Sequence, residues 1–379
     1  MLYYLTYTNI PTKKAFGHPI AQMCDVFSST DDVTLVIPKK KNIIKETHGD
    51  IYKYYGLKNK FPILEIPVIS ASSIAFLGER LSFLIERISF AISSLFIPIK
   101  KDDVIYSRDI LSLHFLRFKY KNLFLEIHYL SKIDGLLIRS GQYLKGLIVL
   151  TSFLKQELID MGYNADRIII APDAVDLSLF DLIKETKTEL RTRLNIPLDK
   201  KVVLYFGNLF HWKGVYTLVD AIEYVNDDVI LVVVGGSDDT LPEFKKYCGS
   251  RKFADKIIVT GYKKYTERAS YLMSADVLCI PNSAKERISK YNTSPLKLFE
   301  YMASGVPILA SDLPSLREVL NEDNATFFNP DDAVSLSDAI NNFLKDTTNA
   351  DKRSKQALVD VQQYTWEIRA KNILKFIHD

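Results

Sequence analysis

The chain has 379 residues, too many for one typical hydrophobic core and enough for two domains of ordinary size. A hydrophobic content of 47%, a charged content of 25% and a net charge of +3 are those of a globular protein without the basic surface needed for bulk nucleic-acid binding. Three scattered cysteines without CxxC spacing indicate neither a disulfide framework nor a zinc site, so a reducing cytoplasm is the expected location.

The N-terminal half alternates short apolar runs with segments of helical pattern. A helix is expected at 19–29, and strands at 3–8, 33–38, 61–67, 104–107, 123–127, 147–150 and 168–171. Strands that alternate with helices at this spacing predict βαβ units and a parallel sheet. The loop after the first strand carries Gly17 at the carboxyl edge of that sheet, where open α/β sheets bind ligands. A glycine there lets the backbone approach a ligand, although a loop glycine is more often a simple turn.

Residues 73–99 form a long apolar stretch with mixed charges inside it and Lys100 and Lys101 after it. We expect either a helix packed on the sheet or a helix lying on a membrane surface, and the mixed charges favour the first. The uncharged part, 88–99, is shorter than the roughly 20 residues that cross a bilayer. The N-terminal residues have neither the basic region nor the cleavage site of a signal peptide.

His128 follows a buried strand directly and so lies at the ligand edge of the predicted sheet. A single histidine in this position is more often a structural residue than a catalyst. Arg108, at the end of the preceding strand, is a weaker candidate on position alone.

The C-terminal half repeats the same organisation after a charged, helical segment at 181–200 that we interpret as a linker. Strands are expected at 202–206, 230–234, 257–260 and 276–281, and several of them end in glycine. The loop after the first of these strands offers Lys213 to a phosphate as a compact, flexible point charge. A lysine in a surface loop is, by itself, usually only solvated.

A helix is predicted from Pro295 to Ser304, with Ser294 as its N-cap and Gly305 as its left-handed stop. Lys297, Glu300 and Ser304 are three and four residues apart and share one polar stripe. The other faces of the helix are apolar, so the helix is expected to be wedged into a fold with its stripe and its N-terminus facing a cleft.

A helix N-terminus in a cleft is an anion site, because free N–H groups and the macrodipole both favour negative charge. A carboxylate two turns along cannot bind that anion, but it can accept hydrogen bonds from the vicinal hydroxyls of a ribose. The helix therefore suggests a nucleoside diphosphate, with its diphosphate at residues 294–296 and its ribose at Glu300. The alternative is an ordinary capped helix with a solvated glutamate.

The string at 292–312, NTSPLKLFEYMASGVPILASD, resembles the nucleotide-sugar signature of glycosyltransferase family 4. In that pattern one glutamate precedes another by eight positions, and an AMASG-like run follows. Glu300 matches the second glutamate and the run is present, but Asn292 stands at the first, a position associated with the transferred sugar. The string 207–214, GNLFHWKG, resembles the family's phosphate loop, with Asn208 in place of the usual arginine.

Other segments extend the resemblance from about residue 9 to residue 366. Glu126 and His128 resemble the E-x-H signature that faces the reacting sugar, and the glycine-bearing first loop resembles the one near the donor phosphates. The string PDAVDLSLF, at 172–180, is similar to the crossing into the second domain. Gly261 and Tyr262 correspond to the border of the nucleobase. The segment around Trp366 is similar to the one that crosses back to the first domain.

The resemblance implies an α/β GT-B fold, with two Rossmann-like, doubly wound parallel-sheet domains facing across a cleft. Residues 1–178 would form the acceptor-side domain, residues 179–362 the nucleotide-sugar domain, and residues 363–379 a helix crossing back to the first domain. The implied donor-binding residues, each at its own position in this sequence, are Gly17, Asn208, Lys213, Gly261, Tyr262, Asn292, Ser294, Pro295, Leu296, Lys297 and Glu300. His128, Lys213 and Glu300 would be catalytic, and Glu126 and Arg108 would lie on the acceptor side.

The implied function is a retaining hexosyltransferase that uses a UDP- or GDP-sugar and a saccharide or lipid-linked acceptor, in surface polysaccharide or glycoconjugate synthesis. No metal or other cofactor is expected, because Lys213 and the helix N-terminus would stabilise the leaving diphosphate. A cytoplasmic protein follows, with peripheral contact to the inner face of the plasma membrane left open and no nucleic-acid partner. The alternatives are a non-catalytic sugar-nucleotide-binding subunit, suggested by Asn208 and Asn292, and a dehydrogenase, which the missing G-x-G-x-x-G fingerprint disfavours.

Overall fold

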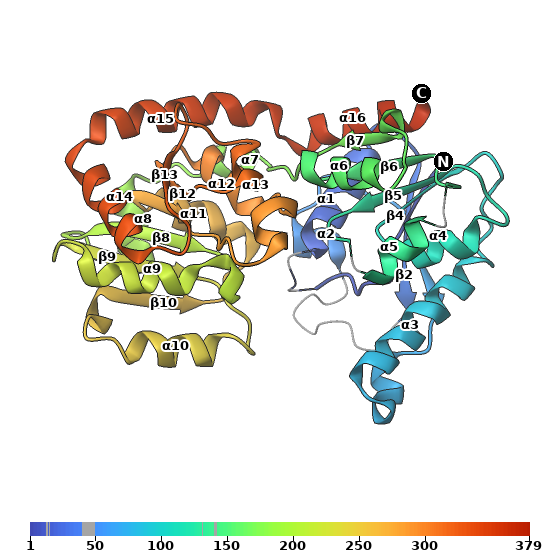
Figure 1. The fold of residues 1–379 in the computed structure, drawn as a ribbon, viewed down its shortest axis with the longest axis horizontal. Helices are drawn as coiled ribbons and strands as arrows, with labels where there is room; N and C mark the ends of the chain where they lie inside the picture. Colours follow the sequence, from blue (N-terminus) through green and yellow to red (C-terminus); the bar gives the residue numbers. More distant parts are fainter. Residues whose placement is uncertain (13, 15, 40–49, 131, 140–141) are drawn as a thin grey trace. The chain divides into compact units, whose positions relative to one another are not determined.

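The computed structural model describes residues 1–379 except 13, 15, 40–49, 131, 140 and 141. Contacts between residues divide the described chain into two units (Figure 1). The first contains Met1–Pro172 together with Trp366–Asp379, and the second contains Asp173–Thr365. Among the described residues, no helix combines the length and the apolar character needed to cross a bilayer.

Unit 1 is built on a seven-stranded sheet of order β3-β2-β1-β4-β5-β6-β7, in which every pairing is parallel. Its strands are β1 (Leu2–Leu5), β2 (Val33–Lys39), β3 (Ile63–Pro67), β4 (Val104–Ser107), β5 (Leu123–Ile127), β6 (Gly146–Val149) and β7 (Ile168–Ile170). The flanking helices are α1 (Gly17–Phe27), α2 (Ile51–Tyr55), the 3-10 helix η2 (Ala71–Leu77), α3 (Glu79–Ser94), α4 (Ile110–Leu116), α5 (Lys132–Arg139), α6 (Ser152–Asp160), the 3-10 helix η3 (Ala165–Arg167) and α16 (Trp366–His378).

Unit 2 is built on a six-stranded, all-parallel sheet of order β10-β9-β8-β11-β12-β13. Its strands are β8 (Lys201–Phe206), β9 (Val229–Val234), β10 (Ile257–Gly261), β11 (Val277–Ile280), β12 (Ile308–Ser311) and β13 (Thr326–Phe328). Its α-helices are α7 (Ser178–Asp181), α8 (Lys187–Leu194), α9 (Val215–Ala221), α10 (Leu241–Gly249), α11 (Arg268–Met273), α12 (Leu296–Ser304), α13 (Pro314–Arg317), α14 (Ala333–Lys345) and α15 (Thr347–Asp360). Short helical turns are η4 (His211–Lys213), η5 (Ile222–Tyr224), η6 (Ala254–Lys256), η7 (Tyr265–Glu267), η8 (Ile288–Asn292) and η9 (Val361–Gln363).

The prediction of two parallel α/β sheets is confirmed, and the reason lies in the strand sequences. All six residues of β9, VILVVV, are buried, because helices cover both faces of a parallel sheet and leave no solvent face for polar residues. The charged segment 181–200 does not stand apart from the units as a linker. It contains α8, which begins with a capping box formed by Thr186 and Glu189 and belongs to unit 2.

Gly17 is the first residue of helix α1 and is buried. A Cβ atom at this position would lie 2.3 Å from the hydroxyl oxygen of Tyr55 and 2.6 Å from the side chain of Thr12. The same hydroxyl accepts a hydrogen bond from the backbone N–H of Thr12 at 2.8 Å. Gly17 is therefore required for close packing inside unit 1, a reason that is independent of any ligand.

Candidate active site

Helix α12 begins one residue later than the sequence predicted. Pro295 has extended backbone angles and is the N-cap residue, so Leu296 is the first helical residue. The expectation of a Ser294 N-cap is wrong: the Ser294 hydroxyl accepts a hydrogen bond from the backbone N–H of Asp173 at 3.1 Å. Among the described residues, no side chain caps the N-terminus of α12. Its first N–H groups are therefore not satisfied by a capping side chain and can receive an anion.

Lys297 lies in the first turn of α12 and is only 7% exposed. Its Nζ has no hydrogen-bond partner among the described residues, and it lies 4.2 Å from the centre of the Tyr205 ring. Burial, together with the nearby charge of Lys213, moves the pKa of Lys297 well below its usual range. An ammonium group in this position is costly unless an anion joins it.

Lys213 reaches the same region from η4, at the carboxyl end of β8. Its Nζ lies 3.7 Å from the centre of the Trp212 ring. Burial lowers the pKa of Lys213 to about 7, although the carboxylate of Asp173 acts in the opposite direction. The next residue, Gly214, has φ of 71°, and a Cβ there would lie 1.6 Å from the carbonyl oxygen of Pro281. Only glycine allows the Lys213 loop to approach the end of β11 so closely.

Two buried asparagines add polar groups to the segments around this lysine pair. Asn282 follows β11 and is fully buried, and neither its amide nitrogen nor its amide oxygen has a partner among the described residues. Asn292 is 3% exposed, and its Oδ1 is likewise without a partner there. Buried amides are normally hydrogen-bonded, so unpartnered ones indicate a site that is completed by something outside the chain.

Glu300 lies one turn beyond Lys297 on α12 and is 4% exposed. It forms an ion pair with Arg268, the first residue of α11. The guanidinium of Arg268 also lies 5.0 Å from the centre of the Phe206 ring and 4.8 Å from that of Tyr265. Burial opposes the charge of Arg268, but Glu300 and Tyr265 raise its pKa. The carboxylate is therefore held in place by a cationic partner, and its oxygens can accept hydrogen bonds.

The other residues of unit 2 that the sequence predicted to bind the donor are Asn208, Gly261 and Tyr262. The contacts described for the first two are made by their backbone atoms. The carbonyl oxygen of Asn208 accepts a hydrogen bond from the Tyr205 hydroxyl at 2.6 Å. Gly261 has φ of 76°, and its carbonyl oxygen accepts from the N–H of Gly235 at 2.9 Å. Tyr262 is 46% exposed. These groups follow β8, β9 and β10, at the carboxyl edge of the sheet where ligands of such folds bind.

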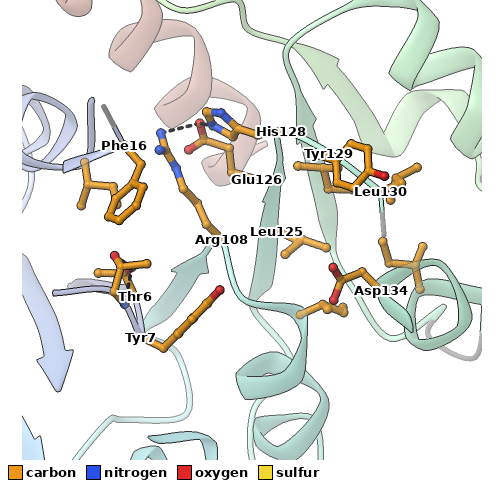
Figure 2. A pocket seen from close by; sticks show the side chains of 15 residues that line it. Thr6, Tyr7, Phe16, Arg108, Leu125, Glu126, His128, Tyr129, Leu130 and Asp134 are labelled. Carbon is orange, nitrogen blue, oxygen red and sulfur yellow. Dashed lines mark hydrogen bonds and ion pairs between the residues drawn. The ribbon is translucent and has the colours of Figure 1, made fainter. Parts of the chain in front are cut away.

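In unit 1, Glu126 is the centre of a buried charge network (Figure 2). It receives hydrogen bonds from Arg108 at 2.8 Å, from His128 at 2.7 Å and from Arg369 of α16 at 2.7 Å. Burial alone would raise the pKa of Glu126, but Arg108 and Arg369 hold it well below its usual range. The carboxylate is thus held by these three partners. Its hydrogen bond with the ring Nε2–H of His128 orients that ring.

A cavity of about 300 Å³ lies beside this network, at the carboxyl edge of the unit 1 sheet (Figure 2). Its wall includes Thr6, Tyr7, Phe16, Arg108, Glu126, His128, Tyr129 and Asp134. The side chain of His128 is 32% exposed, whereas that of Glu126 is fully buried. His128 is thus the member of the predicted E-x-H pair that can touch a molecule in the cavity.

Four residues of these two sites carried no signal in the sequence analysis. Arg268 and Arg369 are isolated arginines on helices, and their partners are 32 and 243 residues away. Asp173 lies in the string at 172–180, which was considered only for its resemblance to the domain crossing, and Asn282 directly follows the expected strand at 276–281. Among the described residues, no cluster of three or more His, Cys, Asp or Glu side chains could hold a metal ion.

Comparison with known proteins shows what part of this chain is similar to. Residues 186–358 match the family model "Glycosyl transferases group 1". The chain is 26% identical over 256 residues to D-inositol 3-phosphate glycosyltransferase of Xylanimonas cellulosilytica, covering 64% of this chain and 59% of that protein. It is 28% identical over 176 residues to the putative teichuronic acid biosynthesis glycosyltransferase TuaC of Bacillus subtilis, covering 46% of this chain and 41% of that protein.

The matched segments thus span about two fifths to three fifths of these relatives. Among solved structures, Anabaena Alr3699/HepE in complex with UDP superposes with a TM-score of 0.73 at 16% identity, covering 100% of this chain and 99% of that one. This likeness shows the fold, which is that of GT-B proteins. Residues 186–358 are therefore similar to the group 1 glycosyl transferases.

Proposed function

We propose that this protein is a retaining glycosyltransferase that moves a hexose-type sugar from a nucleoside diphosphate to a saccharide or lipid-linked saccharide. The observation that carries the proposal is the buried, unpartnered Nζ of Lys297 beside Lys213, at the uncapped start of α12. Two lysines whose pKa values are lowered by burial, next to free backbone N–H groups, form a site for a group with more than one negative charge. A diphosphate is such a group.

The same site gives a mechanism for breaking the bond between sugar and diphosphate. Negative charge develops on the leaving oxygen as this bond breaks, and Lys213 and Lys297 would stabilise it without transferring a proton. Glu300, which is paired with Arg268, would accept hydrogen bonds from the ribose hydroxyls. We propose that the reaction needs no metal ion because the two lysines supply the positive charge. Retention of configuration is inferred from the family resemblance.

The acceptor side of the proposal rests on the cavity in unit 1. Its volume of about 300 Å³ is at the lower end for small-molecule sites, and its wall mixes aromatic rings with hydroxyl groups, which suits part of a sugar. His128 would contact the reacting sugar or the acceptor, and Glu126 and Arg108 would position it. A product in surface polysaccharide or glycoconjugate synthesis accords with the name of the Bacillus subtilis relative. A cytoplasmic enzyme in peripheral contact with the membrane would meet a lipid-linked acceptor.

A thermal-shift screen of UDP, GDP and their hexose derivatives tests the donor half of the proposal. A ligand at about 100 times its dissociation constant stabilises the folded protein by roughly 2.7 kcal/mol, which is easily measured. UDP is the first probe because a neighbour of the same fold was solved with it. Shifts with one nucleotide that disappear in Glu300→Ala support the proposal. No shift with any nucleotide diphosphate would refute it.

A non-catalytic sugar-nucleotide-binding subunit is the second candidate. The observation in its favour is that Asn292, a neutral side chain, stands where the resemblance has a glutamate near the transferred sugar. Release of free sugar or formation of a glycoside from the bound nucleotide sugar would exclude this candidate. Tight nucleotide binding without turnover, under conditions that supply varied acceptors, would favour it.

A further inference from the structure

Helix α3 exposes an apolar side to solvent. Leu81, Leu84 and Ile92 are 47%, 44% and 44% exposed, and Phe96 just after the helix is 82% exposed. With the partly exposed Ile88, these residues recur every three or four positions, so they lie on one side of the helix. We call Leu81, Leu84, Ile88, Ile92 and Phe96 the α3 apolar face. It runs along a helix about 24 Å long.

The side of α3 that packs against unit 1 carries the fully buried Phe90 and Ala91 together with charged and hydroxyl side chains that make specific contacts. Glu86 is 4% exposed and accepts a hydrogen bond from the N–H of Ala71 at 2.7 Å. Arg87 forms ion pairs with Asp109 at 2.6 Å and with Asp134 at 2.9 Å. These charged contacts fix how the helix is rolled about its axis.

Serines of α3 complete this attachment. Ser82 donates to the carbonyl oxygens of Ile74 and Gly78, both at 2.8 Å, and Ser93 donates to that of Pro67 at 2.6 Å. The helix therefore cannot turn its apolar face inward without breaking the attachment. An apolar face held outward by specific polar contacts is typical of an interaction surface.

Both ends of the α3 apolar face are extended by exposed aromatic residues. At the N-terminal end, Phe76 of η2 is 83% exposed, and Phe83, on the other side of α3, is 54% exposed. In Figure 1 this end of α3 reaches away from the unit 1 sheet. Near the C-terminal end, Phe118 is 78% exposed, and Lys119 beside it donates to the carbonyl oxygen of Leu95 at 2.8 Å. The segment after α4 therefore adjoins the end of α3.

Positive charge gathers at this C-terminal end. Lys100, Lys101, Lys119 and Lys121 are exposed, and we call them the lysine cluster. Asp102 is exposed in the same segment and leaves the cluster with an excess of positive charge. At the other end of the face, Glu79 and Arg80 balance each other. Apolar side chains bordered by lysines are the pattern of helices that lie in the interface of an anionic membrane.

We propose that the α3 apolar face and the lysine cluster dock this protein on an anionic lipid surface. Leucine, isoleucine and phenylalanine side chains would enter the boundary between headgroups and acyl chains, and the lysines would contact the headgroups. A second copy of the chain is a poorer occupant, because it would bring the same unneutralised lysines. The inference deepens the proposed function and rests on it, because a lipid-linked acceptor is the reason that the enzyme would bind a lipid surface.

Co-sedimentation of the full chain with vesicles tests the inference. Vesicles of phosphatidylcholine with phosphatidylglycerol should bind the protein, and vesicles of phosphatidylcholine alone should bind it less. The double variant Leu84→Glu/Ile92→Glu should lower the binding constant by about tenfold per side chain. Lys100→Glu/Lys101→Glu should lower it by about fivefold per lysine on anionic vesicles and should remove much of its salt dependence.

The matched control is Leu182→Glu/Val334→Glu, which changes two exposed apolar residues of unit 2 that are 73% and 53% exposed. It should bind vesicles as the wild type does, and all variants should keep the wild-type thermal unfolding midpoint. The inference is overturned if the wild type does not bind anionic vesicles, or if Leu84→Glu/Ile92→Glu binds them equally well. It is also overturned if light scattering shows a dimer that only this variant dissociates. Because nucleotide-induced thermal shifts are measured without vesicles, failure here is distinguishable from failure of the proposed function.

Discussion

Replacing Lys297 with methionine should stabilise the ligand-free protein and weaken its nucleotide binding together. Methionine keeps most of the volume of the lysine side chain and its contact with the Tyr205 ring, but it removes a buried amino group that has no hydrogen-bond partner among the described residues. Leaving such a group unsatisfied costs about 1–3 kcal/mol or more when it is charged. For a unit of this size each kcal/mol corresponds to about 2–4 °C in the unfolding midpoint. The variant should therefore unfold at a higher temperature.

The loss of affinity follows from the same group. A hydrogen bond to a charged partner contributes about 1.5–3 kcal/mol, which is about a ten- to 150-fold change in dissociation constant for the nucleoside diphosphate. Differential scanning calorimetry and isothermal titration with UDP or GDP measure the two effects on one sample. Lys355→Met, at an exposed position of α15, is the control and should change neither quantity. An unchanged or lower unfolding temperature with unchanged affinity would refute the assignment of Lys297 to an anion site.

Three further predictions concern other residues of the two sites. Because the pKa of Lys213 is lowered to about 7 in the free protein, nucleotide binding to its ammonium form above pH 7 requires uptake of a proton. Affinity should therefore fall as the pH rises above 7, by about tenfold per pH unit for this lysine alone, as titration calorimetry in two buffers would show. A flat profile from pH 6 to 9 would contradict this. Arg369→Met leaves the buried Glu126 with fewer cationic partners, so the free energy of unfolding of unit 1, measured in urea, should fall by about 3–5 kcal/mol. A fall within error of zero would mean that Arg108 and His128 alone are enough to stabilise the buried carboxylate. Gly214→Ala should lower both the unfolding temperature and nucleotide affinity, whereas Gly249→Ala, with open space around its Cβ, should lower neither.

The fold could be predicted because short runs of neighbouring residues determine its strands and helices. Each β-strand of unit 2 is a short run of apolar residues, and such runs separated by helical patterns have few other arrangements. The site was predictable where a motif carries it, as with Lys213 and Glu300. The start of α12 was misplaced because Ser294 is bound to the backbone of Asp173, 121 residues earlier in the chain, and sequence spacing does not encode that contact.

The residues that sequence reasoning missed act through partners distant in the chain. Arg268 can be assigned to the site only through its ion pair with Glu300, and Arg369 only through its ion pair with Glu126. For residues 73–99, the sequence allowed both a packed helix and a membrane-surface helix. Periodicity could not decide, because it shows that a helix has a polar and an apolar side but not which side faces the protein. The contacts of Glu86 and Arg87 supply that information.

The second unit is inserted into the first, since Asp173–Thr365 lies between the two segments of unit 1. During synthesis, α16 leaves the ribosome after the whole of unit 2, yet its Arg369 pairs with Glu126 and with the carbonyl oxygen of Pro172. Until α16 has been synthesised, the earlier part of unit 1 therefore contains a carboxylate that is only partly neutralised. Nascent chains stalled before residue 366 should show a protease-resistant unit 2 and a protease-sensitive unit 1, so the half made first is the half that matures last.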